Sequence, residues 1–453
     1  MAADVPPRRA PARATASDDV GRGDRAQRRS PPIPPSRCDQ PTVPPLGPGP
    51  SSAALRVPLA ETEAAAVGAG DVVRAVREGD GFAQTDPFEM VAGHITPLSD
   101  ALRSLLGSSH PVLSAAAEYF VDGDAERKVR PAALLLMASA ARHHEARAAC
   151  DACSEPSEAP SADLGAHITS QQAQLAEITE MVHTASVLHS GVSDSVGVGV
   201  SRRSQRMGAQ LGSLQGLIGN KLAVLAGDFL LARASASLAR LQEAQVVELI
   251  ATAIEDITVG ETNEVLLSRP HASSSSAHGG ADTATSTVEE HLAEYVRSSY
   301  FKTASLIANG CRASLVLGGQ SLSLQRQAWD FGVLFGHALQ LTDDALDFCS
   351  VASACEHRNA DESHVRALLS TAPLVVARAE HKELALMADR SFDGPGDVER
   401  TVQLVKGCGA VERTRRLAIA HAEAAIGVLQ QLTPSPARDA LAQLTCHVVT
   451  RTE

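Results

Sequence analysis

The chain has 453 residues and a formal net charge of −13; 44% of its residues are hydrophobic and only 3% are aromatic. The negative charge argues against a nucleic-acid-binding protein, which needs a basic surface to neutralise phosphates. No run of about 18 apolar residues occurs, so the sequence predicts no transmembrane segment. Alanine and leucine favour helices and aromatic residues favour strands, so this composition predicts an all-α protein.

Residues 1–56 are rich in proline, arginine, serine and alanine. Such a segment buries too little apolar surface to offset the entropy lost on ordering, and we predict that it is disordered. Its arginines outnumber its acidic residues, which is compatible with a transit peptide, but its prolines disfavour the amphipathic helix of such a peptide. Two locations therefore stay open, the mitochondrion (matrix or inner-membrane-associated) and the cytoplasm.

Residues 85–453 are alanine- and leucine-rich and helical in pattern, which predicts one helical domain behind the N-terminal segment. Three stretches interrupt this pattern with small, polar, proline or glycine residues, at 144–168, 191–219 and 268–290. Because these residue types favour turns, we expect loop insertions near all three stretches.

The strongest chemical signal is a group of three acidic residues in the apolar segment 336–348. At 3.6 residues per turn, Asp343 and Asp347 lie one above the other on a helix, with Asp344 beside them. Neighbouring carboxylates repel one another, and no lysine or arginine stands four residues from any of them. Carboxylate oxygens suit Mg²⁺, which also accepts substrate phosphates. The pattern therefore favours a magnesium site over a solvated helix face paired with basic residues.

Residues 340–347 read QLTDDALD and resemble the second aspartate-rich motif of the trans-polyprenyl diphosphate synthases, a family of trans-prenyltransferases. Five other segments resemble stretches of the same family, in the same order. They are 127–131, like its basic isopentenyl-diphosphate motif; 219–231, like a core helix of mitochondrial-type long-chain synthases; 260–261; 300–306, like its lysine–threonine segment; and 396–401. On these segments the chain is identified as a member of this family from about residue 85 to residue 445.

The resemblance implies an isoprenoid-synthase-type antiparallel helical bundle around a central cavity. Such proteins are usually dimeric and use Mg²⁺ to condense isopentenyl diphosphate with an allylic prenyl diphosphate. By position, Lys302 would neutralise the allylic diphosphate, and Thr303 and Gln340 would orient that substrate and shield the carbocation. Asp343, Asp344 and Asp347 would be the metal ligands.

The resemblance also implies a set of basic groups around the substrate phosphates. For His183, a histidine of the helical core is the competing interpretation. Arg202 would stand on the side of the allylic substrate. The contacts to isopentenyl diphosphate would come from Arg127, Lys128, Arg130, His183 and Arg203.

The first aspartate-rich motif of the family is degenerate in this chain. A typical member has two adjacent aspartates and a third one three residues later, whereas residues 190–194 read SGVSD and keep only Asp194 as a candidate metal ligand. The family also commonly places a lysine soon after the second motif, but none occurs between Asp347 and Lys382. This pattern resembles the aspartate-poor partner subunits of heteromeric long-chain synthases, although Lys302 is retained.

Three hypotheses follow. The favoured one is a subunit of a heteromeric long-chain synthase for the ubiquinone side chain, acting with a catalytic sister chain. The second is an autonomous, divergent polyprenyl diphosphate synthase, and the third is a non-catalytic helical binding protein. Ala185 and Ser186 are small where short-chain enzymes use a bulky aromatic residue, which favours a long product.

Overall fold

The structure is a computed structural model of the chain, which divides into two units, 1–49 and 50–453. It describes part of the second unit: residues 70–95, 129–152, 168–190, 220–267, 288–356 and 371–451, without 379, 391, 393 and 395. The disordered segment predicted at 1–56 and the loop predicted at 191–219 lie outside these residues.

The described residues form helices and contain no strand, which confirms the all-α prediction. Residues 87–95 are also helical. The helices are α2 (Asp71–Glu78), α5 (Val129–Ala152), α6 (Ser170–Ser190), α9 (Asn220–Arg240), α10 (Ala244–Leu267), α11 (Val288–Ser299), the π-helix η3 (Tyr300–Ala304), α12 (Ser305–Leu317), α13 (Leu322–Glu356), α15 (Ala372–Arg378), α16 (Lys382–Asp389), α17 (Asp397–Gly407), α18 (Ala410–Leu429) and α19 (Pro436–Thr450).

Two of the expected loop insertions overlap described helices at their edges. Helix α5 continues to Ala152, so the helix extends into the first part of the loop predicted at 144–168. Four of the residues 144–152 are alanine, the best helix former, and this explains the later end. Helix α11 begins at Val288, inside the stretch 268–290. The rest of both stretches lies outside the described residues.

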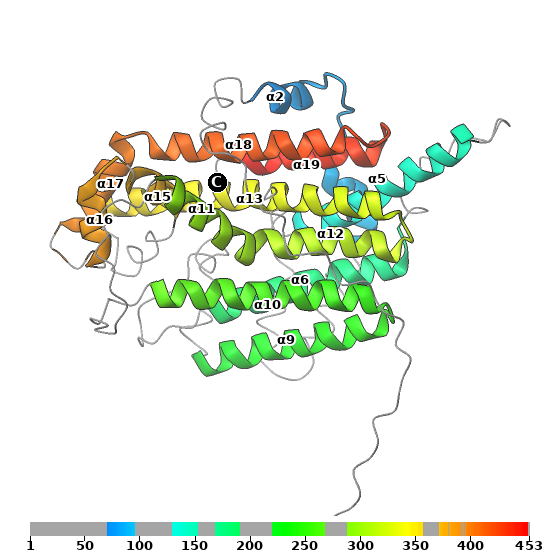
Figure 1. Cartoon of the computed structure of the whole chain (residues 1–453), viewed down its shortest axis with the longest axis horizontal. Helices are drawn as coiled ribbons and strands as arrows, with labels where there is room; N and C mark the ends of the chain where they lie inside the picture. Colours follow the sequence, from blue (N-terminus) through cyan, green and yellow to red (C-terminus); the bar gives the residue numbers. More distant parts are fainter. Residues whose placement is uncertain are drawn as a thin grey trace, which may run out of the picture. The chain divides into compact units, whose positions relative to one another are not determined.

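Helix α13 is the long helix around which the neighbouring helices gather. It packs most extensively against α18 and α12, and α12 in turn contacts α5, α6 and α10. In Figure 1, α18 and α19 run along one side of α12 and α13, and α10 and α9 run along the other. None of the helices in the described ranges is both long and apolar enough to cross a membrane.

Two glycines on α13 bring the segment η3–α12 unusually close to it. A Cβ atom on Gly336 would lie 2.5 Å from the Cα atom of Ala304, and one on Gly332 would lie 2.4 Å from the Cα atom of Ala308. Glycines and alanines spaced four residues apart form matching small faces on the two helices. This contact sets the distance between η3 and the aspartate segment of α13.

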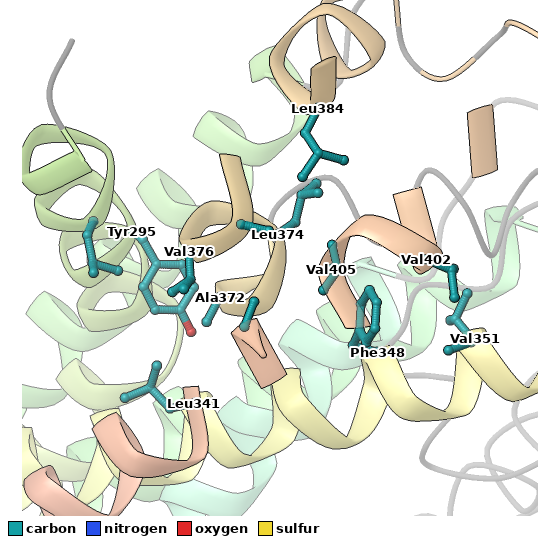
Figure 2. Close-up of a cluster of buried hydrophobic side chains, with 14 of the residues drawn as sticks. Tyr295, Leu341, Phe348, Val351, Ala372, Leu374, Val376, Leu384, Val402 and Val405 are labelled. Atoms are coloured by element: carbon teal, nitrogen blue, oxygen red, sulfur yellow. The ribbon is translucent and has the colours of Figure 1, made fainter. Parts of the chain in front are cut away.

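The aspartate segment of α13 is anchored by its apolar side chains. Leu341 and Phe348 belong to a buried cluster shared by α11, α13 and α15–α18. Figure 2 shows this cluster, in which Phe348 lies near Val402 and Val405 of α17. Burial of these side chains fixes the rotation of α13 about its axis and therefore the directions of its aspartates.

Candidate active site

The lysine–threonine segment forms a single turn of π-helix, η3, between α11 and α12. Such turns interrupt the α-helical spacing and are frequent at functional sites. Gly260 of α10 faces this turn, and a Cβ atom there would lie 3.0 Å from Cγ of Lys302 and 3.1 Å from Cβ of Phe301. The absence of a side chain at Gly260 therefore makes room for Lys302.

A second contact joins η3 and α12 to α10. The Ser305 hydroxyl donates a hydrogen bond to Oδ2 of Asp256, and Nδ2 of Asn309 donates to the carbonyl oxygen of Ser305 over 3.0 Å. Burial raises the pKa of Asp256. Burial, followed by the charge of Asp256, raises the pKa of Tyr300 to about 12, so Tyr300 stays a neutral donor.

Thr303, Gln340 and Asp344 form one hydrogen-bonded chain. Thr303 is only 2% exposed. Its hydroxyl donates a hydrogen bond to Oε1 of Gln340 over 2.6 Å. The Gln340 amide donates through Nε2 to Oδ1 of Asp344 over 2.8 Å. The structure therefore brings together three residues that the sequence predicted for the site, and it links the lysine–threonine segment directly to the aspartate motif.

Asp344 is held by two further donors on its other oxygen. The Tyr295 hydroxyl and the backbone N–H of Ala372 donate to Oδ2 over 2.9 Å and 2.8 Å. The residue is only 4% exposed. Tyr295 and Ala372 are site residues that sequence reasoning missed, and no spacing signal could reveal them because they lie 49 and 28 residues away along the chain.

Asp343 and Asp347 differ from Asp344 in being only partly buried. They stand four residues apart on α13 and share one helical face. The Asp343 side chain is 26% exposed, and its Oδ1 accepts a hydrogen bond of 2.7 Å from Nη2 of Arg451. The motif thus contains two accessible carboxylates on one face and one carboxylate that is built into the helix packing.

Two of the predicted phosphate-binding residues lie in the described part of the chain. Arg130 is in the first turn of α5 and His183 is in α6, and both are buried. Helices α5 and α6 pack against each other and against α12. The remaining predicted residues, Arg127, Lys128, Asp194, Arg202 and Arg203, lie outside the described residues.

A different group of possible metal ligands lies away from the aspartate motif. Ligand atoms of Glu380, His381 and Cys408 come within 4.8 Å of one another near α16 and α17. Nη1 of Arg413 donates to Oε1 of Glu380, which is exposed.

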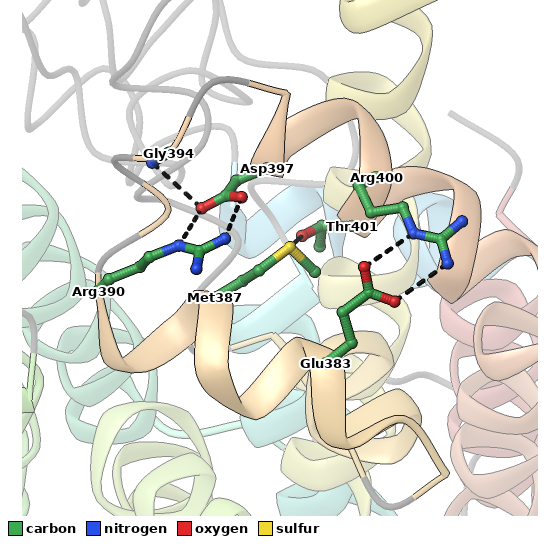
Figure 3. Close-up of polar contacts among 7 residues, drawn as sticks. All are labelled: Glu383, Met387, Arg390, Gly394, Asp397, Arg400 and Thr401. Atoms are coloured by element: carbon green, nitrogen blue, oxygen red, sulfur yellow. Dashed lines mark hydrogen bonds and ion pairs between the residues drawn. The ribbon is translucent and has the colours of Figure 1, made fainter.

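The segment 396–401, which also resembles the family, has a structural role. Arg390 donates to both carboxylate oxygens of Asp397, and the N–H of Gly394 donates to Oδ2 over 3.1 Å (Figure 3). The bond to the Arg390 guanidinium lowers the pKa of Asp397. Arg400 forms a second two-pronged pair with Glu383. These pairs hold α17 against α16.

Comparison with known proteins places this geometry in a known group. A family model described as polyprenyl synthetase matches residues 110–405. The chain is 37% identical over 402 residues to "Probable hexaprenyl pyrophosphate synthase, mitochondrial" of Neurospora crassa, covering 84% of this chain and 85% of that protein. It is 36% identical over 378 residues to "Solanesyl-diphosphate synthase 1, mitochondrial" of Oryza sativa subsp. japonica, covering 82% and 80%. It is also 32% identical to "Decaprenyl-diphosphate synthase subunit 1" of Schizosaccharomyces pombe, covering 80% and 90%.

Solved structures agree with the sequence comparison. The apo form of an Arabidopsis medium/long-chain length prenyl pyrophosphate synthase is 29% identical, has a TM-score of 0.54, and is matched over 82% of this chain and 100% of its own. A polyprenyl synthase from Caulobacter crescentus, complexed with calcium and isoprenyl diphosphate, has a TM-score of 0.59 at 24% identity, over 81% of this chain and 97% of its own. The second likeness, at that identity, bears on the fold alone.

Proposed function

Because the chain belongs to the polyprenyl synthetase family of prenyltransferases, we propose that it serves the condensation of isopentenyl diphosphate with an allylic prenyl diphosphate. In this proposal it is a subunit of a heteromeric long-chain synthase for the ubiquinone side chain. The observation that carries the proposal is the series of hydrogen bonds from Thr303 through Gln340 to Asp344. These bonds join the lysine–threonine segment to the aspartate motif.

The residues of η3 and α13 would act on the allylic substrate. The ammonium group of Lys302, one residue from the fixed hydroxyl of Thr303, would bind the negatively charged diphosphate. The amide of Gln340 is held at both ends by hydrogen bonds, so it would present a fixed dipole to the carbocation that forms when the diphosphate leaves. A group that need not reorganise during the reaction stabilises a developing charge most effectively.

The donor set suits a divalent cation, and we propose Mg²⁺. Asp343 and Asp347 offer carboxylates on one partly exposed helical face, and Mg²⁺ is commonly bound by one or two carboxylates plus substrate phosphates. When bound, the ion would supply positive charge to the leaving diphosphate. Asp344 was also predicted as a ligand, but its oxygens already accept three hydrogen bonds, and we propose that it orients the motif.

Isopentenyl diphosphate would bind beside α5 and α6. Arg130 and His183 are buried on these two helices, where a positive or hydrogen-bonding group requires a polar partner. Both residues have interactions in the structure already, and a diphosphate would join them. Arg127, Lys128 and Arg203 complete the proposed phosphate contacts, with Arg202 on the allylic side and Asp194 as the remaining ligand of the first motif.

The heteromer is supported by the first motif and by the name of one relative. One relative is named as a subunit, and the loss of two aspartates at Ser190 and Gly191 weakens a self-sufficient site. The relatives' names point to the mitochondrion as the location.

An autonomous synthase is the second candidate, favoured by relatives whose names carry no subunit designation. The test incubates the purified chain with Mg²⁺, a short allylic diphosphate and labelled isopentenyl diphosphate, alone and with the chains that co-purify with it. Under our proposal, long-chain product forms only in the mixture. Product from the chain alone would establish the autonomous synthase, and no product in either case from a folded chain would contradict both.

A further inference from the structure

The residue that follows helix α19 contacts the aspartate motif. Helix α19 ends at Thr450, and the next residue, Arg451, has a side chain only 7% exposed. Its Nη2 donates to Oδ1 of Asp343 over 2.7 Å, across 108 residues of sequence. Arg451 is therefore the first residue after α19 and the neighbour of a proposed metal ligand.

The guanidinium of Arg451 is also held by the backbone of its own helix, α19. Its Nε donates to the carbonyl oxygen of Val448 over 3.2 Å. Helix α19 begins with an N-cap, in which the Ser435 hydroxyl oxygen accepts from the N–H of Arg438, and Pro436 occupies its first turn. The helix packs against α5, α18 and α13. Arg451 thus reaches Asp343 from a rigid support.

Such an arrangement has a physical consequence for metal binding. Asp343 and Asp347 are like charges on one helical face, and without a counter-charge they would repel each other. A guanidinium donating to Oδ1 holds the Asp343 carboxylate in one orientation. Partners of this kind orient metal-binding carboxylates, and their loss typically weakens metal binding about 10-fold to 100-fold.

We propose that Arg451 is a positioning residue of the metal site, so that the C-terminal end of α19 forms part of the active site. The inference rests on the proposed function in one respect, that Asp343 holds a divalent cation. A guanidinium also repels cations, so the opposite effect is physically conceivable: an arginine that merely competes with the metal would weaken binding. The sign of one measurement separates these two cases.

The test measures Mn²⁺ binding to the full chain by electron paramagnetic resonance, with Mn²⁺ as a probe for Mg²⁺. Arg451→Ala should weaken binding about 10-fold or more, and Arg451→Lys should weaken it less. Arg400→Ala is the matched control, because it removes another paired arginine on a different surface and should leave binding unchanged. Unchanged or tighter binding in Arg451→Ala would overturn the inference.

A second readout separates positioning from a loss of folding. Thermal unfolding identifies any variant that is not folded. If Arg451→Ala is not folded, Mn²⁺ binding to the milder variant Arg451→Lys is the deciding measurement. Wild-type Mn²⁺ affinity in Arg451→Lys would then contradict the inference. In the active assembly, Arg451→Lys should raise the Mg²⁺ concentration for half-maximal rate and leave the KM for isopentenyl diphosphate unchanged. If Asp343→Asn binds Mn²⁺ as tightly as the wild type, the proposed metal site itself fails, whatever Arg451 does.

Discussion

The Tyr295 hydroxyl donates a hydrogen bond of 2.9 Å to Oδ2 of Asp344, which ties α11 to the centre of the aspartate motif on α13. Asp344 lies between the two helical-face carboxylates in sequence, yet it points into the packing between α11, α13 and α15. The three acids of this motif therefore have two different roles, one in packing and one at the helical face, and substitutions should distinguish the two roles.

We expect Asp344→Asn to lower the free energy of unfolding by about 2 kcal/mol, because an amide cannot accept all the hydrogen bonds that reach this buried carboxylate. Denaturant unfolding of the purified chain measures this. Asp347→Asn is the matched control. It should cost less stability, because Asp347 is partly exposed and its substitution removes the charge repulsion with Asp343. An equal loss in both variants would contradict the division.

In metal-dependent activity, Asp347→Asn should have the larger effect of these two variants. Asp347→Asn removes a carboxylate from the face that Asp343 shares, and we expect it to lower turnover of the active assembly about 100-fold. Mg²⁺-dependent product formation measures the effect. If Asp347→Asn keeps full activity at low Mg²⁺, Asp347 is no ligand.

The hydrogen bond between Thr303 and Gln340 can be removed with almost no change of shape. Thr303→Val replaces the hydroxyl by a methyl group and should cost about 1 kcal/mol of stability, because the partly buried amide of Gln340 loses a partner. We also expect a lower kcat, since the amide is then held only by its hydrogen bond to Asp344. Thr303→Ser keeps the hydroxyl and should behave like the wild type; equal behaviour of both variants would remove Thr303 from the mechanism.

The close approach of α13 to η3 should make Gly336 intolerant of any side chain. A Cβ atom at Gly336 would lie 2.5 Å from Cα of Ala304, and such overpacking costs about 1–3 kcal/mol. Displacement of η3 should also lengthen the Thr303–Gln340 contact, so activity should fall together with the melting temperature. Differential scanning calorimetry and product assays measure the two effects.

Gly427 provides the control for Gly336. It also lies within a helix, α18, but a Cβ atom there would meet nothing within 4 Å. Gly427→Ala should therefore raise stability by up to about 1 kcal/mol, through the helix propensity of alanine alone. A destabilisation as large as that of Gly336→Ala would show that the crossing of η3 and α13 is not the cause.

Two buried histidines should make the fold sensitive to mild acid. His337 of α13 and His421 of α18 have ring centres 5.3 Å apart. Burial lowers the pKa of His421 to about 4, and burial, together with His421, lowers the pKa of His337 well below its usual range. The unfolded chain binds more protons than the folded chain below pH 6.5, so stability falls as the pH decreases.

The expected slope is about 1.4 kcal/mol per pH unit for each histidine between about pH 6.5 and 4. Urea unfolding at a series of pH values measures it. The double variant His337→Leu, His421→Leu should have a flatter profile over this range. An unchanged profile would assign the acid sensitivity to other groups.

Several features of the site could be predicted from the sequence because they depend on neighbours along the chain. The helical spacing of Asp343 and Asp347, with Asp344 beside them, follows from the period of the helix. The assignment of Thr303 and Gln340 rested on the resemblance of short segments, and the structure brings these two residues into contact. The loop predicted near 144–168 overlaps the last residues of α5, because the alanines of this stretch continue the helix to Ala152.

What the sequence by itself determined is the all-α class, the family and the identity of the acidic helix, because periodicity and short motifs are local properties. Only the tertiary structure decided which aspartate is buried by Tyr295 and Ala372 and which is paired with Arg451. Those contacts join residues 28 to 108 positions apart. They depend on how α11, α15 and α19 pack against α13, and packing over such separations leaves no repeat in the sequence.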